Sequence, residues 1–113
     1  MLALNDIAVV VRDAKAAAKW WHEKLGFEIV SKEGHWVTVK PPGPCDVTLH
    51  LCESDAPESG NTGIGFTVAD VAKEAAAMQK KGVRFTKPVE KMAWGTMAMF
   101  ADPDGNEFWM SEA

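Results

Sequence analysis

The amino-acid sequence repeats itself once. Residues 7–13, IAVVVRD, recur as residues 64–70, IGFTVAD. After each copy comes a segment rich in alanine and lysine, then a glycine, Gly26 or Gly82, and then a second apolar stretch. A repeat of this length indicates one supersecondary unit built twice. It restricts the fold to two similar halves, and it makes residues at equivalent positions directly comparable.

Each half has the pattern of a strand, a helix and three further strands. Short β-branched or alternating stretches predict the strands, and Asp13 and Asp70 are good N-caps for the alanine-rich helices. In the first half we expect strands over 4–11, 27–31, 35–40 and 46–53 and a helix over 14–24. In the second half we expect strands over 62–68, 83–87, 95–101 and 107–111 and a helix over 71–81. The predicted fold is α+β: two tandem βαβββ modules that curve their sheets into a half-barrel and leave a concave cavity between them.

The length and composition suit one duplicated domain. The chain has 113 residues, of which 47% are hydrophobic and 25% charged, enough to bury a core and too apolar for a disordered chain. We expect a single domain over 1–113, with a first module at 1–53 and a second at 62–113. Residues 54–61 are polar and include a proline and a glycine, so they are predicted to link the modules.

Charge and hydropathy exclude several classes of function. The net charge is −4 and no basic face is visible, so nucleic-acid binding is not expected. The longest apolar run, 7–11, is far too short to span a membrane, and no signal peptide is apparent. Cys45 and Cys52 lack the CxxC spacing, which favours a cytoplasmic protein with free thiols.

Four stretches resemble a known family. They are 7–13 (IAVVVRD), 25–30 (LGFEIV), 82–85 (GVRF) and 100–106 (FADPDGN), the last being a turn common before the final strand of that family. Together with the duplication, they make the whole chain resemble the vicinal oxygen chelate superfamily. This superfamily includes glyoxalase I, extradiol dioxygenases, fosfomycin-resistance enzymes and bleomycin-resistance proteins. The resemblance implies the fold, but one fold carries many chemistries.

The resemblance also implies where a metal would bind. Metal-dependent members use two histidines and two carboxylates, and these positions fall here at Asp6, His50, Gly63 and Trp109. None of the four keeps the family's residue type. Asp6 and His50 still offer an oxygen and a nitrogen, and Glu107 would be a third ligand only in a shifted geometry, whereas such metal sites normally need three or more protein ligands. We therefore predict no metal and no cofactor.

Asp6 and His50 are the polar candidates for a binding site. His50 alternates with Leu49 and Leu51, so it is expected on the cavity side of its strand. There it could act as a general base, donate a hydrogen bond or simply be solvated. Asp6 either faces a ligand or is a strand-start residue satisfied by a backbone amide. No catalytic residue can be assigned from the sequence.

Tryptophans are the apolar candidates. The chain has five tryptophans and no tyrosine. Bleomycin-resistance proteins, which this chain resembles, bind flat drugs between aromatic side chains without a metal. By that resemblance Trp36, Trp94 and Trp109 are predicted to line a binding cavity; the alternative is that they fill it. The leading hypothesis is a protein that binds or sequesters a small flat aromatic or apolar molecule.

Two other functions stay open at this point. One is a glyoxalase-like lyase or isomerase, or a dioxygenase, with a rearranged metal site. The other is a structural module that self-associates: Trp20 and Trp21 are adjacent on one helix, so one of them is available for an interface. A homodimer is expected in any case. The sequence identifies no ligand and does not say whether the modules pair within one chain or across a dimer.

Overall fold

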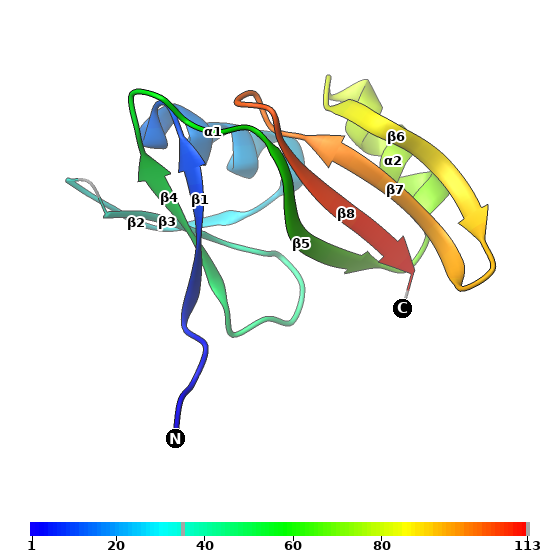
Figure 1. The fold of residues 1–113 in the computed structure, drawn as a ribbon, viewed down its shortest axis with the longest axis horizontal. Helices are drawn as coiled ribbons and strands as arrows, with labels where there is room; N and C mark the ends of the chain where they lie inside the picture. The colour runs from blue at the N-terminus through cyan, green and yellow to red at the C-terminus, as the bar shows by residue number, and fades with distance from the viewer. Residues whose placement is uncertain (35, 113) are drawn as a thin grey trace. The chain divides into compact units, whose positions relative to one another are not determined.

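The order of secondary-structure elements repeats in the computed structural model, which describes residues 1–34 and 36–112. The first compact unit, Met1–Glu58, contains β1 (Asp6–Val11), α1 (Ala14–Leu25), β2 (Glu28–Glu33), β3 (Trp36–Lys40) and β4 (Thr48–Glu53). The second, Ser59–Ala113, contains β5 (Gly60–Val68), α2 (Val71–Lys80), β6 (Arg84–Met92), β7 (Gly95–Ala101) and β8 (Asn106–Glu112) (Figure 1). The predicted α+β fold of two βαβββ modules is confirmed.

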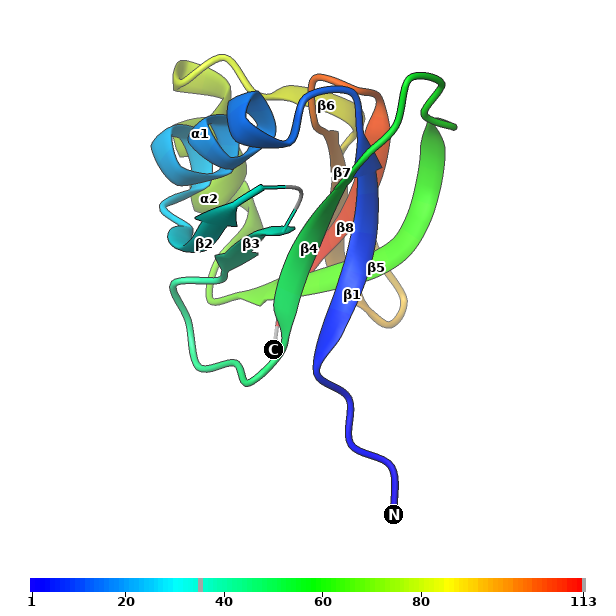
Figure 2. The same cartoon turned by 90° about the vertical axis from the view of Figure 1, so that its left-hand side faces the viewer.

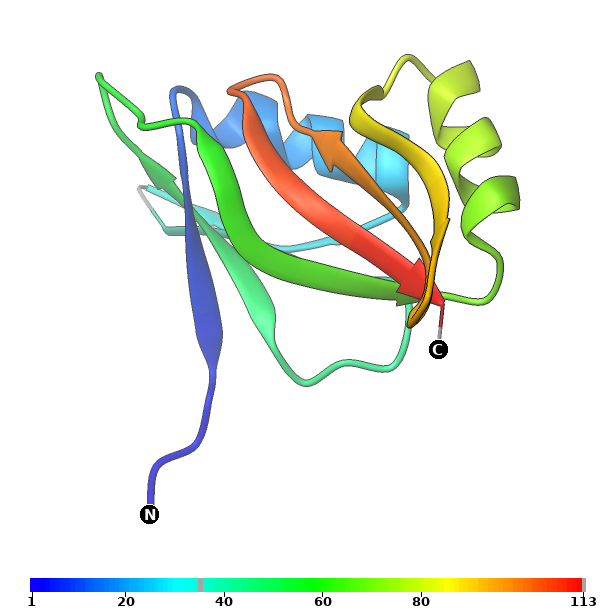
Figure 3. The same ribbon diagram turned by 45° about the vertical axis from the view of Figure 1, so that its right-hand side comes forward.

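Each unit forms one four-stranded sheet with the same topology. The strand orders are β1-β4-β3-β2 and β5-β8-β7-β6. The first and last strands of each unit pair in parallel, and the other pairs are antiparallel. Figure 2 shows α1 over one face of the first sheet, where it packs on β2, β3 and β4. Figure 3 shows α2 beside the second sheet, where it packs on β6, β7 and β8.

The core of each unit lies between its sheet and its helix. In the first unit it contains Trp21, and in the second it contains Phe100 and Phe108, all three fully or almost fully buried. Trp20, the neighbour of Trp21 on α1, is only half-buried and meets the Trp21 ring edge-on. One of the two adjacent tryptophans thus packs in the core, as the sequence predicted. No helix among the described residues is long and apolar enough to cross a membrane.

Each helix is capped at its N-terminus by one aspartate and one glutamate of its own unit. Asp13 and Asp70 act as N-caps and accept hydrogen bonds from backbone N–H groups in the first turn, at 3.0 and 3.1 Å. A glutamate at the end of the last strand adds a second acceptor in each unit. Glu53 accepts from the Ala14 N–H at 3.1 Å, and Glu112 accepts from the Val71 N–H at 3.3 Å. The aspartate caps are evident from the sequence, whereas the glutamate caps are not, because each contact joins residues far apart in the chain.

Replacing Glu112 with alanine is expected to lower the free energy of unfolding by about 1 kcal/mol, because it removes a charged acceptor at a helix N-terminus. Urea denaturation of the two proteins measures the difference. Glu90→Ala is the control, since Glu90 is an exposed carboxylate on β6 that caps no helix. Equal losses in both variants would contradict a capping role for Glu112.

Two strands run further than the sequence indicated. β5 begins at Gly60, so Gly60 and Asn61 lie in a strand and not in the predicted linker; they pair with Asn106 and Glu107. β6 continues beyond the expected end at residue 87 to Met92. Its Pro88 lacks a backbone N–H, which an edge strand tolerates, and the pairing with β7 shifts register there.

The turn before β8 is held by one buried aspartate. The Asp102 carboxylate accepts from the backbone N–H groups of Asp104 and Asn106 and from the Asn106 side chain, at 2.8–3.0 Å. Burial raises the pKa of the Asp102 carboxyl above its usual value, even though these hydrogen bonds act to lower it. The FADPDGN turn therefore fixes the start of β8, the strand that contains Trp109.

Candidate functional site

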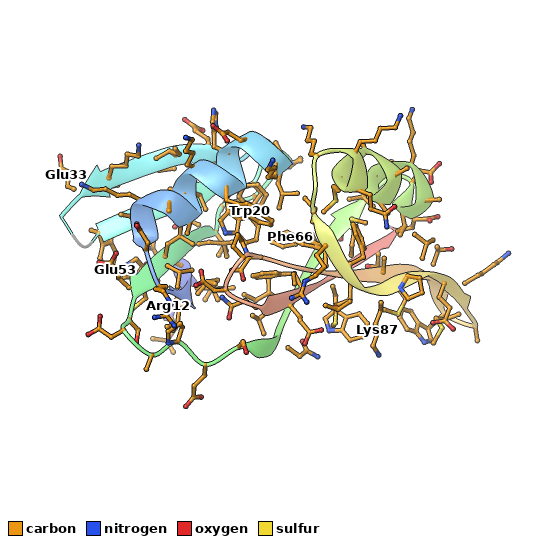
Figure 4. The ribbon with its side chains drawn as sticks, turned by 90° about the horizontal axis from the view of Figure 1, so that it is seen from above. Arg12, Trp20, Glu33, Glu53, Phe66 and Lys87 are labelled. Atoms are coloured by element: carbon orange, nitrogen blue, oxygen red, sulfur yellow. The ribbon has the colours of Figure 1, made fainter. Side chains whose placement is uncertain are left out.

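Each sheet has a face that its own helix does not cover, and we call these the first and second helix-free faces. In Figure 4, Phe66 lies on the α2 side of the second sheet and Lys87 on the opposite side. Strand pairing places one row of residues across the middle of each face. The first central row is Ala8, His50, Thr38 and Ser31. The second central row is Gly65, Trp109, Met99 and Lys87.

His50 and Trp36 form an aromatic pair on the first helix-free face. Their ring centroids are 4.0 Å apart and the planes are inclined by 32°. The Ser31 hydroxyl donates to the Trp36 carbonyl at 3.0 Å and ties the indole's backbone to the next strand. Trp36 remains 53% exposed, so much of the indole that does not contact His50 can meet another molecule. The pair is a ready aromatic platform.

The histidine of this pair has one unused polar atom. His50 Nε2 is buried, and none of the described residues gives it a hydrogen-bond partner. Buried polar atoms are nearly always paired, so an unpaired one needs an explanation. A ligand with a carbonyl, hydroxyl or carboxylate at its edge would supply the missing partner. The other neighbours of His50 in the central row are Ala8, which is small, and Thr38, which is buried.

Asp6 lies further along the same face. It pairs with Thr48, one register step from the Ala8–His50 pair on that face, so it is not the direct neighbour of His50. Its carboxylate accepts a hydrogen bond from the Asn5 side chain at 3.0 Å. The partner of Asp6 is therefore a side-chain amide and not the backbone amide considered from the sequence. A ligand contact of Asp6 stays a prediction.

The second helix-free face presents Trp109 with a different companion. The ammonium of Lys87 lies 5.3 Å from the centroid of the Trp109 ring. Met99, which is almost fully buried, separates the two residues in the central row. Trp94 occupies the turn between β6 and β7, where it is 68% exposed, and so is not part of the row. Roles of Trp94 and Trp109 in binding stay predictions.

A family model describes most of the chain. Residues 3–110 match the model of the glyoxalase/bleomycin resistance protein/dioxygenase superfamily. The chain belongs to this superfamily. The match confirms the resemblance drawn from the four sequence stretches, and the two sheets with their helices agree with it.

Three other proteins are similar to this chain over nearly their full lengths. Uncharacterized protein YetH of Bacillus subtilis (strain 168) is 31% identical and covers 96% of this chain and 97% of its own. The solved structure of a superfamily member from Sphaerobacter thermophilus DSM 20745 is 30% identical, with a TM-score of 0.87 over 100% of this chain and 98% of that one. TnmS3, an antibiotic binding protein from Streptomyces sp. CB03234, is 28% identical, with a TM-score of 0.86 over 99% and 96%.

The superfamily's metal-ligand positions do not fit a metal ion in this member. The register Ala8–His50 matches Gly65–Trp109, so His50 and Trp109 occupy equivalent positions in the two units. Trp109 offers only an N–H donor. Gly63 has no side chain, and its φ of +74° at a strand irregularity disfavours one. Residues 1–34 and 36–112 contain no group of three or more His, Cys, Asp or Glu that could hold a metal.

Two contributors to the faces of this superfamily member escaped sequence analysis. Ser31 and Lys87 join the central rows only because the β2–β3 and β6–β7 pairs shift register. Simple alternation along a strand does not predict such shifts. The available signal for Lys87 was the neighbouring proline, which marks an edge strand with irregular pairing.

Proposed function

We propose that the protein binds a small, flat, partly aromatic or apolar molecule without the help of a metal ion. The observation that carries the proposal is the Trp36–His50 pair, an exposed indole held against a histidine whose Nε2 lacks a partner. The similarity to TnmS3, an antibiotic binding protein, supports the same class of function. Sequestration, in which the ligand is held and not transformed, requires no further residue.

The energetics favour a ligand that is flat and polar at one edge. Stacking a ring on Trp36 contributes about 0.5–1.5 kcal/mol beyond the burial of apolar area. A hydrogen bond to the unpaired Nε2 contributes about 0.5–1.5 kcal/mol and removes the cost of leaving that atom unsatisfied. Together these two contributions favour the binding of an aromatic carbonyl compound or phenol over that of an aliphatic molecule of equal size. Asp6 is proposed as a further contact on the first unit, and Trp94 and Trp109 are proposed as ligand contacts of the second unit.

The proposal is tested with a panel of flat compounds, such as naphthalene, acridine and anthraquinone derivatives, titrated into the protein while tryptophan fluorescence is recorded. We expect saturable quenching by at least one class, at a stoichiometric ratio. Aliphatic compounds of matched size are the control. A panel in which no compound changes the fluorescence, repeated by calorimetry with the same result, would rule the proposal out.

Removal of metal ions is expected to leave binding unchanged. Two of the four positions at which the superfamily binds a metal are Gly63 and Trp109 here, and neither supplies a ligand atom. Protein dialysed against a chelator should bind the best panel compound with the affinity of untreated protein, as measured by calorimetry. The control is chelated protein supplemented with zinc, nickel or manganese. Binding that is lost on chelation and restored by one ion would replace the proposal with a metal-dependent one.

We also propose that the protein forms a homodimer. Trp20 is half-buried beside the fully buried Trp21, which leaves aromatic surface on α1. Leu2 and Leu4, ahead of β1, are exposed as well. Apolar surface of this kind is typical of contact regions. Sedimentation velocity over a range of protein concentrations decides between monomer and dimer.

A further inference from the structure

A cation and an indole lie together on the second helix-free face. The Lys87 ammonium is 5.3 Å from the centroid of the Trp109 ring, within the range of a cation–π contact. The two residues come from different strands, β6 and β8, and both belong to the second central row. The pairing of β6, β7 and β8 therefore determines that they meet.

The neighbours of Trp109 in the second central row are Met99 on β7 and Gly65 on β5. Met99 fills the central row between Lys87 and Trp109 and is only 2% exposed, so it forms a firm apolar floor. The neighbour of Trp109 in β5 is Gly65, and a β-carbon there would reach ordinary contact with the Trp109 Cβ, at 3.7 Å. Because Gly65 has no side chain, β5 adds no side chain beside Trp109 at this register position.

The ammonium of Lys87 has no carboxylate partner in the described chain. Within residues 1–34 and 36–112 no ion pair involves Lys87, whereas Lys19 on α1 pairs with Glu23 at 4.0 Å. The rows on either side carry Arg84 and Glu107 in one direction and Glu90 in the other, so the face as a whole is close to neutral. The cation beside the indole is thus a local feature and not part of a broad positive field.

We propose that this surface selects flat aromatic anions: the ring packs against Trp109 while its carboxylate, sulfonate or phenolate pairs with Lys87. An aromatic anion satisfies both groups at once, since its ring meets apolar surface and its charge meets an unpaired ammonium. An aromatic cation would instead be repelled by Lys87. This inference rests on the proposed function, because it requires Trp109 to contact a ligand, and it adds the charge of that ligand.

The test compares three probes that share one ring: naphthalene-2-carboxylate, 2-naphthamide and 2-naphthylmethylammonium. Calorimetric titration of the wild-type protein should show the carboxylate binding about fivefold more tightly than the amide, the size expected for one partly exposed charge pair. The ammonium should bind more weakly than the amide. In about 1 M salt the carboxylate should lose its advantage, because the screening length there is only about 3 Å.

Two variants assign the preference to Lys87. Lys87→Met keeps an apolar stem but removes the charge, so the carboxylate and the amide should bind equally, whereas Lys87→Arg should keep the preference. Lys91→Met is the matched control. Lys91 lies on the same strand and is also exposed. It pairs with Thr96, one residue beyond the Glu90–Met97 pair, so its side chain projects from the opposite face of the sheet.

The outcomes separate this inference from the proposed function. A carboxylate preference that survives in Lys87→Met, or that disappears equally in Lys91→Met, would overturn the inference. Equal binding of all three probes to the wild-type protein would overturn it too, while leaving the binding of flat molecules intact. If no naphthalene probe binds, the inference is wrong, and the wider panel of acridines and anthraquinones alone decides the proposed function.

Discussion

Replacing Trp36 with alanine is expected to weaken the binding of a flat ligand by about tenfold or more. The substitution removes the exposed indole surface and the stacking on His50, and a loss of about 1.4 kcal/mol corresponds to tenfold. The fold should survive, because Trp36 is 53% exposed and contributes little to the core. Calorimetry is the suitable measurement, since the variant also lacks one of the reporting fluorophores.

The Trp36 result needs a companion that keeps the ring. Trp36→Phe retains an aromatic surface next to His50 and should lose less affinity than Trp36→Ala. Trp20→Phe, a change on the helix side of the same unit, should leave the affinity as it is. If Trp36→Ala binds every panel compound as the wild-type protein does, the Trp36–His50 pair is not the binding platform.

Replacing Trp21 with alanine is expected to lower the free energy of unfolding by about 3–5 kcal/mol. Trp21 is fully buried between α1 and the first sheet, and its ring lies 4.8 Å from that of Phe27. Alanine would leave a cavity that the surrounding strands could close only in part. Since small domains are stable by only about 5–15 kcal/mol, a large share of the stability would be lost.

The adjacent Trp20 provides the matched control for this prediction. It has the same side chain on the same helix but is half-buried, so Trp20→Ala should cost clearly less than Trp21→Ala. Urea denaturation followed by circular dichroism measures both. Similar losses in the two variants would show that burial of Trp21 is not what stabilises the first unit.

The frame of the fold could be derived from the sequence because its signals are local. An aspartate N-cap, an alanine-rich helix and a terminating glycine lie within one short segment, and the repeat shows them twice. Asp13 and Gly26 were placed correctly on this basis. The glutamate caps Glu53 and Glu112 could not be found in the same way, since each lies at the far end of its module from the helix that it caps.

The candidate site could be predicted only in part, for a similar reason. Alternation along β4 put His50 on the face away from the core, and strand pairing then brought Trp36 against it. Strand register is set by bulges and by contacts between strands, neither of which a single strand reveals. Lys87 was therefore missed. Trp94 lies in an exposed turn outside the central row, and its role in binding stays a prediction.

The two central rows have consequences for how such a protein can evolve. The capping aspartates and glutamates recur in both units, whereas the matched positions of the rows differ: histidine against tryptophan, threonine against methionine, serine against lysine. The same βαβββ unit thus tolerates unrelated side chains at the matched positions of its central row. Substitutions at the row positions that are not buried are expected to cost little folding stability, and under the proposed function each of the two surfaces could then change its ligand preference independently of the other.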